Sequence, residues 1–150
     1  MPLSLTFKID DQAVKKRLAK IATGVADLSE PFTNMGEELG DFYGNEVFES
    51  QGKALGENWK PLSPATLKLR RERRLHYAKA PIATDKILIW TGALKKGLKK
   101  TAERMRLTIE NTVEYFKYNQ PKRRMLAINS KVMEIALKHI RQHLHNLIYR

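Results

Sequence analysis

Three glycines recur at intervals of four in one amphipathic stretch, and this spacing constrains the fold more than any other feature of the sequence. The stretch covers residues 31–49, and the glycines are Gly36, Gly40 and Gly44. Each interior glycine of a helix costs about 1 kcal/mol relative to alanine. A helix that keeps three of them on one face needs another backbone close by. Either the core of the same chain or a neighbouring subunit supplies it.

Apolar residues with a helical period predict three long helices, over about 14–28, 31–49 and 130–149. A further, shorter helix is expected to begin at Pro64, with Ser63 as its N-cap. We expect the apolar stripe of each long helix to face the core. The stripes consist of Val14, Leu18, Ile21, Val25 and Leu28; of Met35, Leu39, Phe42, Tyr43 and Val47; and of Val132, Ile135, Ala136, Ile140, Leu144, Leu147 and Ile148.

Three stretches carry the signals of β-structure. Residues 3–9 and residues near 104–118 alternate between apolar and polar side chains, which predicts an N-terminal strand and a β-hairpin. A short apolar run near 87–90 predicts another strand. An α+β fold follows, in which a small, mainly antiparallel sheet packs against three to four helices within one domain over residues 1–150. The apolar residues of the N-terminal strand are Leu3, Leu5, Phe7 and Ile9.

The formal net charge of +12 is distributed unevenly along the chain. Residues 21–52 contain seven acids and no Lys or Arg, whereas residues 53–106 contain fifteen basic residues and four acids. This separation favours binding of an acidic partner, of nucleic acid or of a second copy, but it equally fits a surface charged only for solubility. A basic arm at about 64–86 and two later clusters hold the candidate contacts to a partner or nucleic acid. These are Lys68, Arg70, Arg71, Arg73, Arg74, Lys95, Lys96, Lys99, Lys100, Arg123 and Arg124.

The sequence offers no complete set of residues for catalysis or for a metal site. It has no cysteine, and we find no nucleophile elbow, phosphate-binding loop or dinucleotide-binding motif. His139 and His143 are four residues apart, the spacing that zinc-binding helices use, but a metal site needs three or four convergent ligands. We therefore expect no enzymatic activity, no cofactor and no metal. A metal-dependent hydrolase built on these two histidines remains as an alternative.

Trp59 lies in a polar loop that two glycines and two prolines punctuate. An exposed indole gains nothing from water, so we expect the ring to be buried against the core, near Trp90 and Leu94. Burial of an indole contributes about 3 kcal/mol or more, which is enough to hold such a loop in one place. A fixed loop would present the basic arm at the surface.

Two segments resemble the phage virion morphogenesis family, whose members are also called tail completion proteins. They read FESQGKALGENWKPLSPATL and ILIWTGALKKGL, and a later tyrosine resembles the one in a strand of the family. The histidine and glycine that often follow this tyrosine in the family are replaced here by Tyr118, Asn119 and Pro121. The matching residues are Phe48, Gly52, Gly56, Trp59, Pro61, Leu62, Ser63, Thr66, Leu88, Trp90, Thr91, Gly92, Leu94 and Tyr115.

The resemblance implies a non-catalytic structural protein that completes the tail or joins it to the head, acting as a ring of copies. Its partners would be tail or head-connector proteins. It would lie in the host cytoplasm during assembly and then in the tail or neck of the virion. The basic surface of residues 68–106 keeps open a second function, sequence-independent binding of DNA or RNA. No apolar stretch is long enough to cross a bilayer, so we expect no membrane contact.

Overall fold

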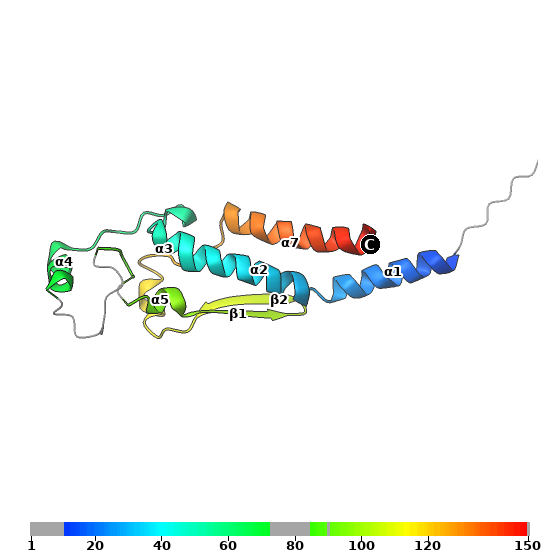
Figure 1. The fold of residues 1–150 in the computed structure, drawn as a ribbon, viewed down its shortest axis with the longest axis horizontal. Helices are drawn as coiled ribbons and strands as arrows, with labels where there is room; N and C mark the ends of the chain where they lie inside the picture. Colours follow the sequence, from blue (N-terminus) through cyan, green and yellow to red (C-terminus); the bar gives the residue numbers. More distant parts are fainter. Residues whose placement is uncertain (1–10, 73–84, 90, 150) are drawn as a thin grey trace, which may run out of the picture.

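The α+β class is confirmed by the computed structural model, which describes residues 11–72, 85–89 and 91–149. Figure 1 shows an elongated body in which α2 lies between α7 and a two-stranded sheet. The elements are α1 (Asp11–Ala26), α2 (Ser29–Asp41), the π-helical turn η1 (Phe42–Glu46), α3 (Val47–Glu49), the 3-10 turn η2 (Lys53–Leu55), α4 (Pro64–Arg71), α5 (Ala93–Lys96), β1 (Leu98–Glu103), β2 (Arg106–Asn111), α6 (Phe116–Asn119) and α7 (Ser130–Tyr149).

The glycine-bearing face of α2 and η1 lies against the β-hairpin of the same chain. A Cβ added at Gly40 would lie 2.7 Å from the Lys100 side chain, and one added at Gly44 would lie 3.4 Å from Leu98. Gly36 faces the same hairpin through β2. The close approach therefore comes from within the chain, but it is made mainly by side chains of the hairpin, with a backbone group, the Lys95 carbonyl, only near Gly44 at 3.7 Å.

Strands β1 and β2 pair in antiparallel register, with Leu98 opposite Asn111 and Glu103 opposite Arg106. A hairpin is thus confirmed, but its predicted position near 104–118 is wrong, because Met105 lies in the turn between the strands. Asn111 ends β2. Its side chain donates to the Leu94 carbonyl at 2.6 Å and so ties the strand to α5.

The strand predicted near 87–90 is wrong over the described residues, since residues 87 and 88 form a turn. Leu88 has a φ of 60°, which no strand residue adopts. Ile87 and Ile89 are nevertheless buried, so the apolar run signals burial and not an extended backbone. The predicted N-terminal strand, Trp90 and residues 73–84 of the basic arm lie outside the described residues.

The hydrophobic core lies where η1 and α3 meet the start of α7 and the loops around it. Val47, Phe48 and Met125 are almost fully buried at its centre. The Tyr43 hydroxyl donates to the Ala127 carbonyl at 2.6 Å, and burial raises the pKa of this phenol. The predicted stripes of α2 and of the first half of α7 therefore face the core.

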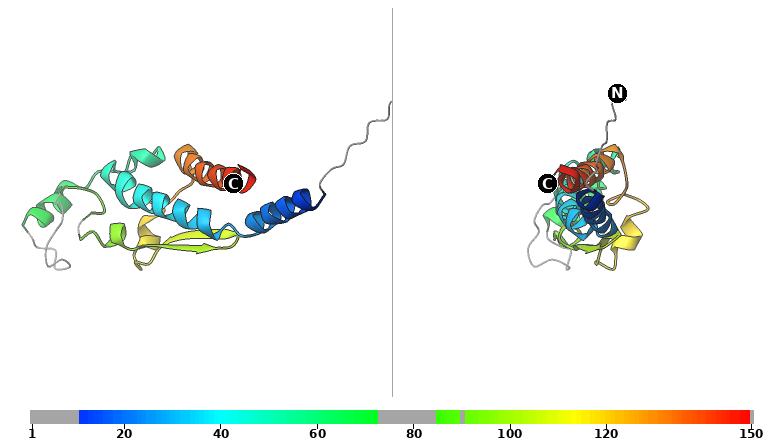
Figure 2. Two further views of the ribbon diagram at one scale, coloured as in Figure 1. Left: turned by 45° about the vertical axis from the view of Figure 1, so that its right-hand side comes forward. Right: turned by 90° about the vertical axis from the view of Figure 1, so that its right-hand side faces the viewer.

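Helix α1 departs from this arrangement because it extends away from the body, beyond the end of α2 (Figures 1 and 2). It meets the end of α7 through Arg17, which donates to the Ile148 carbonyl, and through Gly24, whose carbonyl lies 3.0 Å from His143 Nε2. Residues 12–20 are all exposed. The expectation that its apolar stripe faces the core is therefore wrong.

Candidate interaction site

The indole of Trp59 closes the loop that follows α3. It is 6% exposed, so the burial expected from the sequence is confirmed. The ring meets Phe48 edge to face, with centroids 5.7 Å apart and planes at 82°. Nε1 donates to the Arg124 carbonyl at 3.1 Å, which joins the loop to the segment before α7. Leu94, which we expected nearby, belongs to the same core cluster, and Trp90 lies outside the described residues.

Glycine is required at the position where the chain leaves α3. Gly52 has a φ of 91°, and its amide donates to the Val47 carbonyl at 2.9 Å, which ends the helix. A Cβ added there would lie 2.5 Å from Trp59 Nε1. Gly56 has a similar φ of 78° but faces open space. Gly52 therefore serves both the turn and the packing of the indole, whereas Gly56 serves only the turn.

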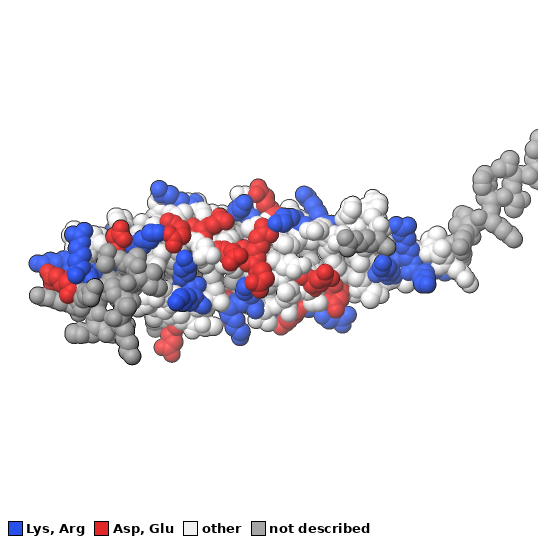
Figure 3. Space-filling view, viewed as in Figure 1, with Lys and Arg blue, Asp and Glu red and all other residues white. Residues whose placement is uncertain are grey.

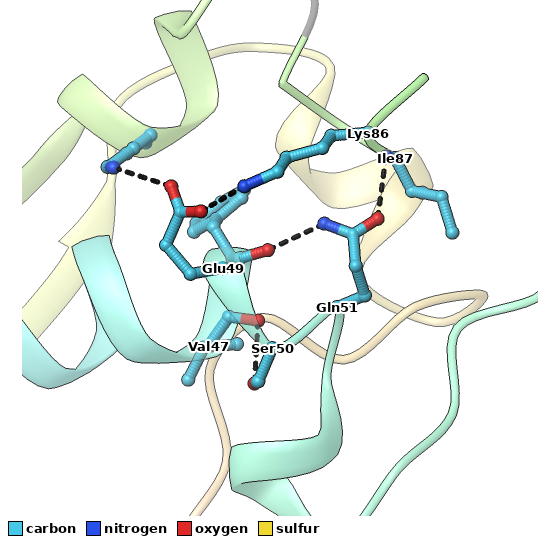
Figure 4. Close-up of polar contacts among 8 residues, drawn as sticks. Val47, Glu49, Ser50, Gln51, Lys86 and Ile87 are labelled. Atoms are coloured by element: carbon cyan, nitrogen blue, oxygen red, sulfur yellow. Dashed lines mark hydrogen bonds and ion pairs between the residues drawn. The ribbon is translucent and has the colours of Figure 1, made fainter. Parts of the chain in front are cut away.

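Gln51 connects this loop to the second motif (Figure 4). Its Oε1 accepts a hydrogen bond from the Ile87 amide at 2.7 Å, and its Nε2 donates to the Phe48 carbonyl at 2.6 Å. The φ of Gln51 is 54°, an uncommon value for a residue other than glycine. We call Glu49, Gln51, Arg70, Lys86 and Ile87 the motif junction.

Ion pairs and a buried arginine complete the motif junction. Glu49 pairs with Lys86 and, at 3.4 Å, with Lys95. The hydrogen bond from Lys86 is the main cause that lowers the pKa of the Glu49 carboxyl below its ordinary value, and Lys95 adds to it. Arg70 donates from Nη1 to the Lys86 carbonyl at 2.8 Å. The junction thus fixes residues 86 and 87 from two sides.

The assignment of Arg70 to contact with a partner or nucleic acid is wrong. It is 8% exposed, and burial lowers the pKa of its guanidinium. Its side chain supports the turn at residue 86 from inside the molecule. Lys68 and Arg71 are exposed on α4, and Lys68 lies 3.9 Å from Glu72. Arg73 and Arg74 lie outside the described residues.

The remaining motif residues position α4 and α5. Ser63 Oγ accepts a hydrogen bond from the Thr66 amide at 3.2 Å, so its predicted role as the N-cap of α4 is confirmed. Pro61 is exposed, and Leu62 packs against the core. Gly92, with a φ of 76°, starts α5.

Residues of the second motif surround one concave surface. Leu88, Thr91, Leu94 and Tyr115 line a cavity of about 700 Å³, together with Arg70, Ala93 and Asn119. Leu94 is buried, whereas Tyr115 is 46% exposed at the rim. We call this space the motif cavity. Its lining is mainly aliphatic and aromatic, and its polar groups are the hydroxyls of Thr91 and Tyr115, the amide of Asn119 and the guanidinium of the buried Arg70.

The acidic and basic segments meet within one chain. Lys100 lies 2.6 Å from Glu37, and Arg104 lies 3.7 Å from Asp27. In Figure 3, acidic groups cross the middle of the body with basic groups beside them. Lys95 and Lys99 also pair with carboxylates, and Arg124 pairs with Glu57. Arg123 donates to the Lys60 carbonyl at 3.2 Å, and Lys96 is exposed. Much of the charge that we assigned to contacts with a partner or nucleic acid therefore pairs with groups of the same chain.

The two candidate metal-binding histidines have other contacts. His139 Nε2 lies 2.8 Å from Glu38 Oε2, and His143 Nε2 lies 3.0 Å from the Gly24 carbonyl of α1. Hydrogen bonds from Lys138 and then His139 lower the pKa of Glu38. Among the described residues, no three His, Cys, Asp or Glu side chains converge on a metal position. No helix in the described part of the chain combines the length and the apolarity needed to span a bilayer.

Sequence reasoning missed three amide side chains that hold the loops. They are Gln51, Gln120, whose Oε1 accepts from the Met125 amide at 2.8 Å, and Asn129. Asn129 caps α7 by accepting from the Val132 amide at 3.0 Å, and it donates to the Ala54 carbonyl at 2.9 Å. An asparagine directly before an apolar stripe is a recognisable N-cap signal. No sequence signal marks the two glutamines.

The fold and this site define a small α+β protein in which two motifs, distant in sequence, are joined beside one concave surface. The model of the phage virion morphogenesis family matches residues 9–115. That range contains both motifs and more than half of the chain, so the chain belongs to this family. No curated protein and no solved structure matches it.

Proposed function

We propose that this protein is a non-catalytic assembly component that completes the phage tail or joins it to the head as a ring of copies. Family membership supports a role in virion assembly. The observation that carries the finer proposal is the motif cavity, which is lined by residues of the second motif and by Tyr115. A concave surface with a mainly apolar lining suits an inserted side chain from another virion protein.

The chemistry of the described residues favours contact over reaction. The polar side chains at the motif junction are engaged with main-chain groups or with one another. Catalysis needs an acid or base and a stabilising group around a space for substrate. In the described part of the motif cavity, only Thr91, Tyr115, Asn119 and the buried Arg70 are polar. On this proposal the protein acts in the host cytoplasm and then in the tail or neck.

Binding of DNA or RNA without sequence preference is the second candidate, and the net charge of +12 favours it. The ion pairs of Lys95, Lys99 and Lys100 weigh against it, because a phosphate would have to displace a carboxylate at each of them. A gel shift at low salt tests this candidate. Binding that weakens steeply as salt rises would support it, and no binding at low salt would exclude it.

Complementation of a phage that lacks this protein tests the leading proposal. We expect electron micrographs of the deletion to show separate heads and tails, or tails with unfinished ends, and wild-type protein to restore whole particles. Tyr115→Ala, at the rim of the motif cavity, should restore few particles. Tyr118→Ala is the matched control, because Tyr118 is 65% exposed and does not line the cavity. Complete particles without the protein would refute the proposal.

A further inference from the structure

Helix α1 contacts its own chain with a different face from its apolar stripe. Arg17 and Gly24 meet α7, whereas Leu18, one residue further round the helix, is 60% exposed. Val14 and Val25, on the same stripe as Leu18, are also exposed. An amphipathic helix gains most of its stability in a protein by burying this stripe. Val14, Leu18 and Val25 therefore leave most of this stripe exposed, whereas Ile21 and Leu28 of the same stripe are half-buried.

The position of α1 sets what the residues before it can reach. The hairpin tip lies beside the joint between α1 and α2, because the Leu28 amide donates to the Arg104 carbonyl at 2.8 Å. From this joint α1 runs away from the hairpin (Figures 1 and 2). With 16 residues it is about 24 Å long. Leu3 can lie at most about 27 Å from Asp11. With α1 in this position, residues 3–9 cannot lie along their own β2.

An apolar groove lies between β2 and α7, over the buried stripe of α2. Its volume is about 410 Å³, and it is lined by Met35, Leu39, Leu107, Ile109 and Met133 among others. All of its hairpin residues come from β2, so the groove follows the edge of β2 that does not pair with β1. Met133 is 49% exposed at the rim. A two-stranded sheet is marginally stable alone, and an open edge is a template for another strand.

We propose that the N-terminal arm, residues 3–26, of one copy docks on a second copy, where residues 3–9 form a strand along β2. The alternation of these residues would place Leu3, Leu5, Phe7 and Ile9 on one face, over the groove. An arm of about two dozen residues matches the 20–30 residues that each side of a standard interface contributes. Arm and groove are different surfaces of one chain, so the contact is heterologous, and repeated contacts close into a ring if the rotation allows. This inference rests on the ring in the proposed function.

Cysteine pairs test this contact directly, because the wild-type chain contains no cysteine. Separately purified Phe7→Cys and Met133→Cys proteins are mixed and oxidised mildly. We expect a disulfide-linked dimer that contains one copy of each. Lys8→Cys replaces Phe7→Cys in one control, since Lys8 lies on the other face of the predicted strand. Glu134→Cys replaces Met133→Cys in the other, since residue 134 points about 100° away on α7. Each control should give at least about tenfold less dimer.

The inference would be overturned if no mixed dimer formed, or if the control pairs gave as much dimer as Phe7→Cys with Met133→Cys. A third test uses one chain that carries both Phe7→Cys and Met133→Cys. The inference would also be overturned if the disulfide formed only within this double variant at high dilution, and not between chains. The last would mean that the arm folds back on its own chain. Light scattering gives a second readout that needs no cysteine. Phe7→Asp should weaken self-association about tenfold or more, and Lys8→Asp should not. A wild-type protein that stays monomeric at high concentration also overturns it.

The complementation experiment separates this inference from the proposed function. A mixed dimer together with complete particles in the deletion would refute the function and leave the arm contact standing. Unfinished particles in the deletion without a mixed dimer would refute the arm contact alone.

Discussion

Replacing Gly52 by alanine should destabilise the protein much more than the same change at Gly56. Both glycines have positive φ angles, so an alanine at either position pays a cost of about 1–2 kcal/mol for the left-handed backbone. Only at Gly52 does the added Cβ collide with another residue, at 2.5 Å from Trp59 Nε1. The indole cannot simply move away, because Phe48 and the Arg124 carbonyl hold it.

The collision should add about 1–3 kcal/mol, the usual cost of forcing extra atoms into a packed interior. We therefore expect Gly52→Ala to lower the free energy of unfolding by about 2–5 kcal/mol and Gly56→Ala by about 1–2 kcal/mol. In a Trp59→Phe background, the five-membered ring nearest to the added Cβ is gone. The cost of Gly52→Ala should then fall to that of Gly56→Ala.

Urea unfolding followed by far-UV circular dichroism measures these differences without relying on tryptophan emission. Five proteins are needed for the test: the wild type, the two alanine variants, the Gly52→Ala/Trp59→Phe double variant and its reference, Trp59→Phe. Equal losses at the two glycines would refute the reasoning. So would a Gly52→Ala cost that stays unchanged in the Trp59→Phe background.

Three further outcomes follow from the site. Gln51→Ala should cost about 2 kcal/mol, because it removes two hydrogen bonds and leaves the Ile87 amide without its acceptor; urea unfolding that matches wild type would contradict this. Asn129→Ala should cost about 1 kcal/mol or more through the lost cap of α7, whereas Asn129→Asp should keep the cap; equal losses would contradict a capping role. Hydrogen bonds from Ser29 are the main cause that lowers the pKa of Asp27, and hydrogen bonds from Lys138 and Lys86 are the main causes for Glu38 and Glu49. These contacts therefore stabilise the fold above the ordinary carboxylate pKa of about 4 and lose this effect as pH falls further. Thermal unfolding between pH 7 and pH 3 checks this, and Glu49→Gln should show a smaller loss on acidification than wild type.

The sequence predicted the elements whose signals are long and local. Helix α7 was expected over 130–149 and found at Ser130–Tyr149, because its apolar stripe runs unbroken for five turns. Ser63 could be assigned as a cap because serine before proline is a local helix-start signal. Neither prediction needed knowledge of the rest of the fold.

The predictions that proved wrong concern segments whose structure depends on contacts with residues distant in sequence. The apolar run at 87–89 fits a strand or a buried turn equally well, and Gln51 and Arg70, which bind main-chain groups of residues 86 and 87, select the turn. A row of arginines on a helix suggests an exposed face, yet Arg70 is buried and donates to the Lys86 carbonyl. The charge pattern was read correctly as a separation along the chain, but chain folding brings the opposite charges together. Such pairings cannot be inferred from spacing alone.

The bond between Trp59 Nε1 and the Arg124 carbonyl also sets an order of events during synthesis, because the two residues are 65 positions apart. At about 5–20 residues per second, the ribosome needs about 3–13 s to extend the chain from one to the other. Until then the indole has no carbonyl to bind, and truncated products that stop before residue 124 never acquire it. Until residue 124 has been made, this loop therefore lacks the hydrogen bond that ties it to the segment before α7.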